Sequence, residues 1–272
     1  MIRRAVFAGR FYAGRPGALR EEVESHLDRG ASPEDVLGCV CPHAGYVYSG
    51  DVAGAVLSAV NIPKTVVVIA FSHRGMGRRY AVWPEGDWQT PLGDVPLNRE
   101  LTDRLIGTSK LLEADTTAFT SEHSGEVMLP FLQVLRPDVD VVMMSVYPAS
   151  PLRDLQTIGY EMADAVKEVA SRPLILASSD MTHYAPAAVA ERQDRLAIDR
   201  MLELDETGLF EVVRDRDISM CGVCPVVTAM TCVKALGATR ARLVRYENSG
   251  KASGDHDSVV GYAGLVFKQA GT

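Results

Sequence analysis

The feature that most constrains the fold is a series of apolar runs rich in β-branched residues, separated by longer stretches with helical periodicity. The run 65–71 reads Thr-Val-Val-Val-Ile-Ala-Phe, without alternation of polar and apolar residues. Such a run is typical of a strand that is buried on both faces. The chain of 272 residues shows no linker between compositional halves, so we expect one domain over residues 1–272. Strands that alternate with helices predict an α/β sheet covered on both faces.

The pattern predicts six strands and eight helices. The strands are expected at Val36–Cys41, Thr65–Phe71, Val139–Val146, Pro173–Ala177, Ala241–Tyr246 and Val259–Phe267. The helices are expected at Gly17–Arg29, Val52–Val60, Arg99–Ile106, Glu126–Leu135, Leu152–Ala170, Val189–Leu202, Thr207–Arg214 and Gly222–Leu236. In the stretch 152–170, apolar residues recur every three or four positions, which indicates a stripe that faces the core.

Charge and hydropathy exclude several classes of protein. The chain has 28 Lys+Arg against 35 Asp+Glu, a net charge of −7, whereas a nucleic-acid partner requires clustered positive charge. The longest uncharged run, Ile218–Val233, contains Pro225 and is shorter than the roughly 18–20 apolar residues that span a bilayer. Arg10 and Arg15 interrupt any export-type segment at the N-terminus. We therefore expect a cytoplasmic protein with neither a nucleic-acid partner nor a membrane partner.

Four of the six histidines fall at the boundaries of predicted elements. His43, His73 and His183 each follow a predicted strand, and His123 precedes an apolar helix. If the strands are parallel, their carboxyl ends form one edge of the sheet, and these loops converge there. Imidazole is the commonest ligand of transition metals and the commonest acid or base at neutral pH. The pattern therefore predicts a shared metal or acid/base site, while His26 is expected on a helix surface and His256 in a loop.

The five cysteines are too few and odd in number for a disulfide framework. Cys221 and Cys224 stand at the start of an apolar helix, where the backbone N–H groups lower the pKa of a thiol. Three interpretations remain open: a redox pair, a four-cysteine zinc site with Cys39 and Cys41, and a mixed site of one thiolate with two histidines. Simple burial is the default for Cys39, Cys41 and Cys232.

Two carboxylates lie close to histidines in the sequence. Asp180 stands three residues before His183, and Glu122 directly precedes His123. A carboxylate that accepts the second ring N–H of a histidine fixes its tautomer. Glu122 has a second interpretation, as a capping charge at the start of a helix together with Glu126. The chain has no glycine-rich dinucleotide or P-loop motif, no His-Glu-x-x-His and no Gly-x-Ser-x-Gly.

Several segments, in order and nearly end to end, resemble the Memo family. They are Ala5–Tyr12, Pro42–Gly50, Glu122–Glu126 with Leu129–Leu132, Ser178–Asp180 with His183 and Tyr184, Cys221–Gly222 and Ser258–Tyr262. The resemblance implies a fold similar to that of class III, LigB-type extradiol dioxygenases, in which a central mixed β-sheet is flanked by helices and holds a metal pocket. It further implies that the metal ligands are His43, His73 and Cys221. The neighbouring catalytic residues that it implies are His123, Asp180 and His183.

The chain departs from the family pattern at two places, and its third expected metal ligand differs from that of the dioxygenases. The second histidine of the family usually follows Gly-Pro-x, whereas His73 follows Ala70-Phe71-Ser72, and Ala13 replaces the usual proline after Phe-Tyr. In the dioxygenases a carboxylate completes two histidines, whereas this chain offers Cys221. A thiolate is softer than a carboxylate, so the preference among Fe(II), Cu and Zn need not follow the dioxygenases.

The function expected from this resemblance is that of a metal-dependent oxidoreductase with a mononuclear metal ion, Fe(II) first and Cu or Zn as alternatives. Its substrate would be a small molecule. The alternative is a non-catalytic binding or adaptor protein whose pocket holds a peptide or a partner protein. A third hypothesis is a thiol redox protein that uses Cys221 and Cys224. The resemblance also implies an AMME-type domain protein and a radical S-adenosylmethionine protein as partners, and a homodimer is the generic expectation for any soluble chain.

Overall fold

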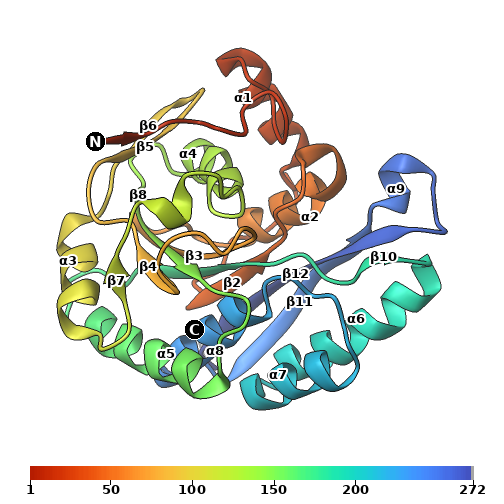
Figure 1. Ribbon diagram of the computed structural model, residues 1–272. Helices are drawn as coiled ribbons and strands as arrows, with labels where there is room; N and C mark the ends of the chain where they lie inside the picture. The colour runs from red at the N-terminus through yellow and green to blue at the C-terminus, as the bar shows by residue number, and fades with distance from the viewer. Residues whose placement is uncertain (271–272) are drawn as a thin grey trace.

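The computed structural model describes residues 1–270 and confirms the six predicted strands, each with similar bounds (Figure 1). These long strands are β2 (Gly38–Cys41), β3 (Thr65–Phe71), β8 (Asp140–Val146), β9 (Leu174–Ser178), β11 (Arg240–Asn248) and β12 (Val259–Lys268). The structure adds short strands that the sequence pattern did not predict. They are β1 (Ile2–Arg3), β4 (Tyr80–Val82), β5 (Asp87–Thr90), β6 (Gly93–Val95), β7 (Glu113–Ala114) and β10 (His183–Ala185).

The eight predicted helices are also present. They are α1 (Pro16–His26), α2 (Tyr46–Ser58), α3 (Arg99–Thr108), α4 (Leu129–Leu135), α5 (Leu152–Lys167), α6 (Ala187–Leu202), α7 (Glu206–Asp215) and α8 (Val223–Ala235). The short elements η1 (Thr117–Phe119), η2 (Glu126–Met128) and α9 (Gly250–Ser253) complete the set over residues 1–270. None of the helices in this part of the chain is long and apolar enough to cross a membrane.

The large sheet is mixed, with a parallel centre. Within residues 1–270 it has nine strands, in the order β10-β12-β2-β9-β3-β8-β4-β7, and β11 pairs with β12. The four central strands β2, β9, β3 and β8 are mutually parallel, whereas β12 and β4 pair with them in the antiparallel direction. A second sheet of three strands has the order β1-β5-β6. Because the four central strands run the same way, all their carboxyl ends lie at one edge of the sheet.

Helices cover both faces of this sheet, which explains why every residue of β3 is buried (Figure 1). The core on one face contains side chains from α3, α5, α6, α7 and α8, and the core on the other face contains side chains from α1, α2 and α4. The apolar stripe of α5, with Leu155, Ile158, Met162 and Val166, is buried as its periodicity predicted. The predicted fold class, an α/β structure with a central mixed sheet flanked by helices, is therefore confirmed.

Two helix boundaries differ from their predictions for local reasons. Helix α2 begins at Tyr46 rather than Val52 and so includes Gly50, which together with Gly54 allows the end of α1 to approach the helix closely. A Cβ atom at Gly54 would lie 2.1 Å from the backbone oxygen of His26. The predicted helix 126–135 begins as the 3₁₀ turn η2, and α4 follows with Pro130 in its first turn, where a missing N–H costs nothing.

The contact between α5 and α8 gives a test of this packing. A Cβ atom at Gly159 of α5 would lie 2.6 Å from Thr231 Cβ and 2.8 Å from the Thr228 oxygen, so Gly159→Ala must push the two helices apart. We expect it to lower the free energy of unfolding by about 1–3 kcal/mol. Gly107→Ala in α3 is the matched control, because nothing lies within 4 Å of its Cβ position. The control should raise stability by up to about 1 kcal/mol in urea unfolding, and equal effects of both changes would contradict the proposed packing.

Candidate metal centre

Three neighbouring parallel strands bring predicted site residues to one edge of the sheet. His43 lies two residues beyond β2, His73 two residues beyond β3, and Asp180 two residues beyond β9. Since β9 pairs with both β2 and β3, these three residues are neighbours in space. The ring centroids of His43 and His73 are 5.1 Å apart. The prediction that the strand ends converge is therefore confirmed.

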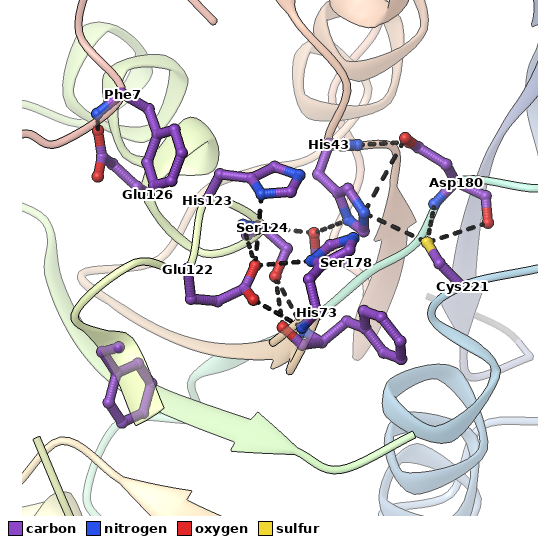
Figure 2. A network of polar contacts seen from close by, with 12 residues as sticks. Phe7, His43, His73, Glu122, His123, Ser124, Glu126, Ser178, Asp180 and Cys221 are labelled. Atoms are coloured by element: carbon purple, nitrogen blue, oxygen red, sulfur yellow. Dashed lines mark hydrogen bonds and ion pairs between the residues drawn. The ribbon is translucent and has the colours of Figure 1, made fainter. Parts of the chain in front are cut away.

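His123 joins this pair from the loop that precedes η2 (Figure 2). Its ring stacks on that of His73 at a centroid distance of 4.3 Å, and its centroid lies 5.3 Å from that of His43. One nitrogen from each of the three rings lies within 4.8 Å of the other two. The three imidazoles can therefore bind the same metal ion.

Hydrogen bonds set the tautomers of His43 and His73. The Ser178 hydroxyl donates to the Ser124 carbonyl oxygen over 2.7 Å, so it must accept the hydrogen bond from His43 Nδ1, 2.8 Å away. The Nδ1–H of His73 donates to Glu122 Oε1 over 2.9 Å. In both rings the proton is thus on Nδ1 and the lone pair is on Nε2, which in His43 faces the Cys221 sulfur 3.2 Å away. This arrangement is typical of histidines that bind metals through Nε2.

The Glu122 carboxylate holds the backbone around His73 as well as its ring. Its Oε2 accepts the His73 N–H and its Oε1 accepts the Ser124 N–H, each over 2.8 Å. Burial alone raises the pKa of Glu122, but the hydrogen bond and charge of His73, with the Ser124 N–H, lower it to about 2. Glu122 therefore contacts the histidine of β3, whereas its sequence neighbour His123 is 3.7 Å away. The Glu122 carboxylate thus contacts His73 and Ser124. It does not accept a hydrogen bond from the first turn of η2, which the capping interpretation predicted.

Two of the histidines, His43 and His123, are held in their neutral forms. Burial, followed by repulsion from His43 and His73, lowers the pKa of His123 to about 3. Burial, followed by the neighbouring His73, also lowers the pKa of His43 well below its usual value. Neutral imidazole is the form that binds a metal ion.

Cys221 and Asp180 lie against His43 (Figure 2). The Cys221 sulfur is 3.2 Å from His43 Nε2, and Asp180 Oδ1 accepts the His43 N–H over 2.7 Å. The second carboxylate oxygen of Asp180 is 3.9 Å from His43 Nε2. The expected lowering of the thiol pKa is wrong for the metal-free protein: burial and then the Asp180 charge raise the pKa of Cys221 well above its usual value. Cys221 precedes the first residue of α8, Val223, and burial outweighs the effect of the helix N-terminus.

The remaining cysteines do not share this environment. The Cys224 thiol donates to the Pro148 carbonyl oxygen over 3.2 Å, whereas Cys221 contacts His43. Cys39, Cys41 and Cys232 are fully buried, as their default interpretation predicted. These partners separate Cys224 from the histidine cluster and favour a mixed site of one sulfur with imidazoles over a four-cysteine zinc site.

His183 is outside the three-histidine group but lines the same cavity. Its Nδ1–H donates to the Ser219 carbonyl oxygen over 2.9 Å, and its backbone N–H donates to the Ser219 hydroxyl over 2.7 Å. A cavity of about 620 Å³ is lined by His73, His123, Asp180 and His183 among other residues. His26 lies at the end of α1 and pairs with Asp51 over 2.7 Å, and His256 is exposed in a loop.

Sequence reasoning missed the two serines that orient His43. Ser178 accepts from His43, and Ser124 supplies the carbonyl oxygen for Ser178 as well as a hydroxyl that bonds the backbone of Phe71. The available signal was the position of Ser178, which is a polar residue at the last place of a buried strand. A buried polar residue needs a hydrogen-bond partner, so a serine at the end of a buried strand predicts a polar contact with a neighbouring site residue.

The fold and the site together define an α/β protein with a histidine cluster at the carboxyl edge of a mixed sheet. The family model for Memo-like proteins matches residues 3–266, and the chain belongs to the Memo family. A MEMO1 family protein from Methanothermobacter thermautotrophicus is 38% identical over 277 aligned residues, which cover 97% of this chain and 100% of that protein. Another, from Desulfurococcus amylolyticus, is 39% identical and covers 97% of this chain and 98% of its own.

A solved structure shares the fold. An uncharacterized protein from Escherichia coli K12 superposes with a TM-score of 0.52 over 76% of this chain and 88% of its own. The sequence identity is 15%, so the likeness concerns the fold alone.

The low pKa of Glu122 predicts how stability depends on pH. A carboxyl whose pKa falls from 4.5 in the unfolded chain to about 2 in the folded chain stabilises the protein above pH 4.5, and this contribution is lost as the pH falls toward 2. At about 1.4 kcal/mol per unit of pKa, the contribution is roughly 3 kcal/mol. In metal-free protein, Glu122→Gln should lower the free energy of unfolding by roughly this amount at pH 7 and flatten its slope between pH 4.5 and the acid limit.

Urea unfolding at a series of pH values measures both effects. Glu21→Gln serves as the control, because Glu21 is exposed on α1 and should change stability by less than about 0.5 kcal/mol. An unchanged pH slope in the Glu122→Gln variant would show that Glu122 does not hold His73 through its charge.

Proposed function

We propose that this protein binds one metal ion through His43 and His73, with His123 and Cys221 completing the ligand set, and acts as a non-heme metal-dependent oxidoreductase. The observation that carries this proposal is the group of three imidazole nitrogens within 4.8 Å of one another. The hydrogen bonds from His43 to Ser178 and from His73 to Glu122 support it, because they leave each Nε2 free to bind a metal. Cys221 is included because its sulfur already contacts His43 Nε2.

Iron(II) is the metal that we propose first, with copper and zinc as alternatives. Imidazole nitrogens suit all three ions. Asp180 places a carboxylate beside His43, and two histidines with one carboxylate are the usual ligands of iron(II) in oxygenases. This similarity in donor groups supports the further proposal that the pocket is related to those of the LigB-type extradiol dioxygenases.

The surrounding residues would bind and orient a small-molecule substrate. A bound metal would supply a Lewis acid that, in the case of iron or copper, can also exchange electrons. His183 donates its Nδ1–H to the Ser219 carbonyl oxygen, so its Nε2 is free to accept a proton from a molecule in the cavity. Asp180 accepts the backbone N–H of His43 and thereby holds this residue beside the cavity that Asp180 lines.

Metal analysis tests this proposal. Protein prepared without a metal-affinity tag and under anaerobic conditions should contain about one equivalent of iron, copper or zinc by mass spectrometry. His43→Ala and His73→Ala should each lose the metal, because each removes an imidazole that has no substitute. His123→Ala and Cys221→Ser should weaken binding by at least about tenfold in a competition with a chelator.

Cys224→Ser is the matched control for Cys221→Ser. Its side chain keeps a donor for the Pro148 carbonyl oxygen and lies apart from the histidines, so metal content should not change. A full equivalent of metal in the His43→Ala variant, or wild-type protein that binds none of the three ions on reconstitution, would contradict the proposal.

A further inference from the structure

The wall of the cavity beside the histidines has an unusual set of side chains. It contains four aromatic residues, Phe11, Tyr48, Tyr184 and Tyr262, and the carboxylates of Asp180 and Asp255, but neither lysine nor arginine. Arg10 and Arg74 are next to lining residues in the chain, but their side chains are exposed and are not part of the wall. Without a metal ion at the histidines, a cavity that has no lysine or arginine offers the carboxylate or phosphate of a ligand no partner for an ion pair.

The two carboxylates of the wall lack partners of opposite charge. Asp180 is 5% exposed, and its Oδ1 accepts the His43 N–H. Within residues 1–270 its Oδ2 has no hydrogen-bond donor, since His43 Nε2 is 3.9 Å away. Asp255 is exposed at the mouth and forms no ion pair within the same residues. A divalent ion at the histidines would be balanced by Glu122 and Asp180, so the negative charge of Asp255 would remain for a ligand.

Two of the aromatic side chains are exposed where the cavity opens. Tyr184 is 79% exposed and has a backbone φ of 58°, a left-handed conformation that is rare for a bulky residue. Tyr48, at the start of α2, is 44% exposed. Strained residues of this kind concentrate at functional sites, where the surrounding structure holds them in place. Here the strain presents an aromatic ring on the same cavity wall as Asp255.

We propose that the ligand of this cavity is an organic cation, a protonated amine attached to an apolar body. The ammonium group would lie between the Asp255 carboxylate and the faces of Tyr48 and Tyr184, because aromatic faces and carboxylates both attract cations. The apolar body would pack against Phe11 and Tyr262, toward the histidines. This inference rests on the proposed function in taking the cavity as the substrate site, but the recognition of charge does not require a bound metal.

A series of probes that share one apolar body tests the charge preference. The probes are 2-phenylethylammonium, 2-phenylethanol and 3-phenylpropanoate, and their binding to wild-type protein is measured by isothermal titration calorimetry at pH 7, with and without metal. We expect the cation to bind about tenfold more tightly than the neutral alcohol. In metal-free protein, where the carboxylate has no metal ion to coordinate, we expect the anion to bind more weakly than either.

Two aspartates two residues apart provide a variant and its control. Asp255→Asn should remove most of the preference for the cation, yet it keeps the oxygen that accepts the Asp257 N–H over 2.9 Å and so keeps the loop intact. Asp257→Asn removes an equally exposed charge that is not part of the cavity wall, and it should leave the preference unchanged. Tyr184→Leu keeps apolar area without the aromatic face, and it should weaken binding of the cation more than binding of the alcohol.

The outcomes separate this inference from the proposed function. In metal-free protein, equal affinities for the three probes, tightest binding of the anion, or no binding of any probe at millimolar concentration would overturn the inference. An equal loss of preference in Asp255→Asn and Asp257→Asn would also overturn it, because the effect would then be one of net charge. Metal content is measured on the same samples. If the protein binds a full equivalent of metal but shows no preference for the cation, the inference is wrong and the proposed metal site is not contradicted.

Discussion

The arrangement of the site depends on one buried carboxylate, that of Glu122. It accepts the ring N–H and the backbone N–H of His73 and the N–H of Ser124, and it is 3% exposed. A buried charge is costly unless hydrogen bonds compensate it, so Glu122 and its three donors must fold as a unit. Through Ser124, whose carbonyl oxygen accepts from Ser178, the same unit extends to the partner of His43. The orientation of two histidines from different strands thus follows from a single anchoring group.

The five residues 122–126 connect the site to the rest of the molecule. Glu126 is completely buried, pairs with Arg3, and accepts hydrogen bonds from the Phe7 N–H and the Tyr12 hydroxyl. These contacts hold the N-terminal segment so that Phe11 packs on His123, with ring centroids 4.5 Å apart. Gly125 lies between Glu122 and Glu126 on the sheet, and a Cβ atom there would contact the end of the Met143 side chain at 2.6 Å. One short loop therefore positions His73, His123 and the chain terminus together.

The sequence predicted those parts of the structure that depend on long patterns. The strand 65–71 is buried on both faces and could be recognised from its composition. The rule for parallel strand ends placed His43 and His73 together, whereas His183, which the same rule included, lies outside the three-histidine group. Strands such as β4 have only three residues, too few for a period to be visible. His123 comes from a loop, so its stacking on His73 depends on tertiary contacts that no spacing encodes. The contact of Glu122 with His73 was missed for the same reason: the two residues are 49 positions apart in the chain.

The proposed metal ligands and the exposed residues of the cavity wall come from different parts of the chain. The histidines proposed as metal ligands follow β2 and β3 or lie next to Glu122 in the chain, and Cys221 lies just before α8. Tyr48, Tyr184 and Asp255 instead lie on the first turn of α2, on the edge strand β10 and in an exposed loop. Exposed loops tolerate substitution because few buried contacts depend on them. Under the two proposals, ligand preference can therefore change through Tyr48, Tyr184 and Asp255 while the proposed metal ligands are kept, which is the separation that a scaffold needs in order to serve more than one substrate.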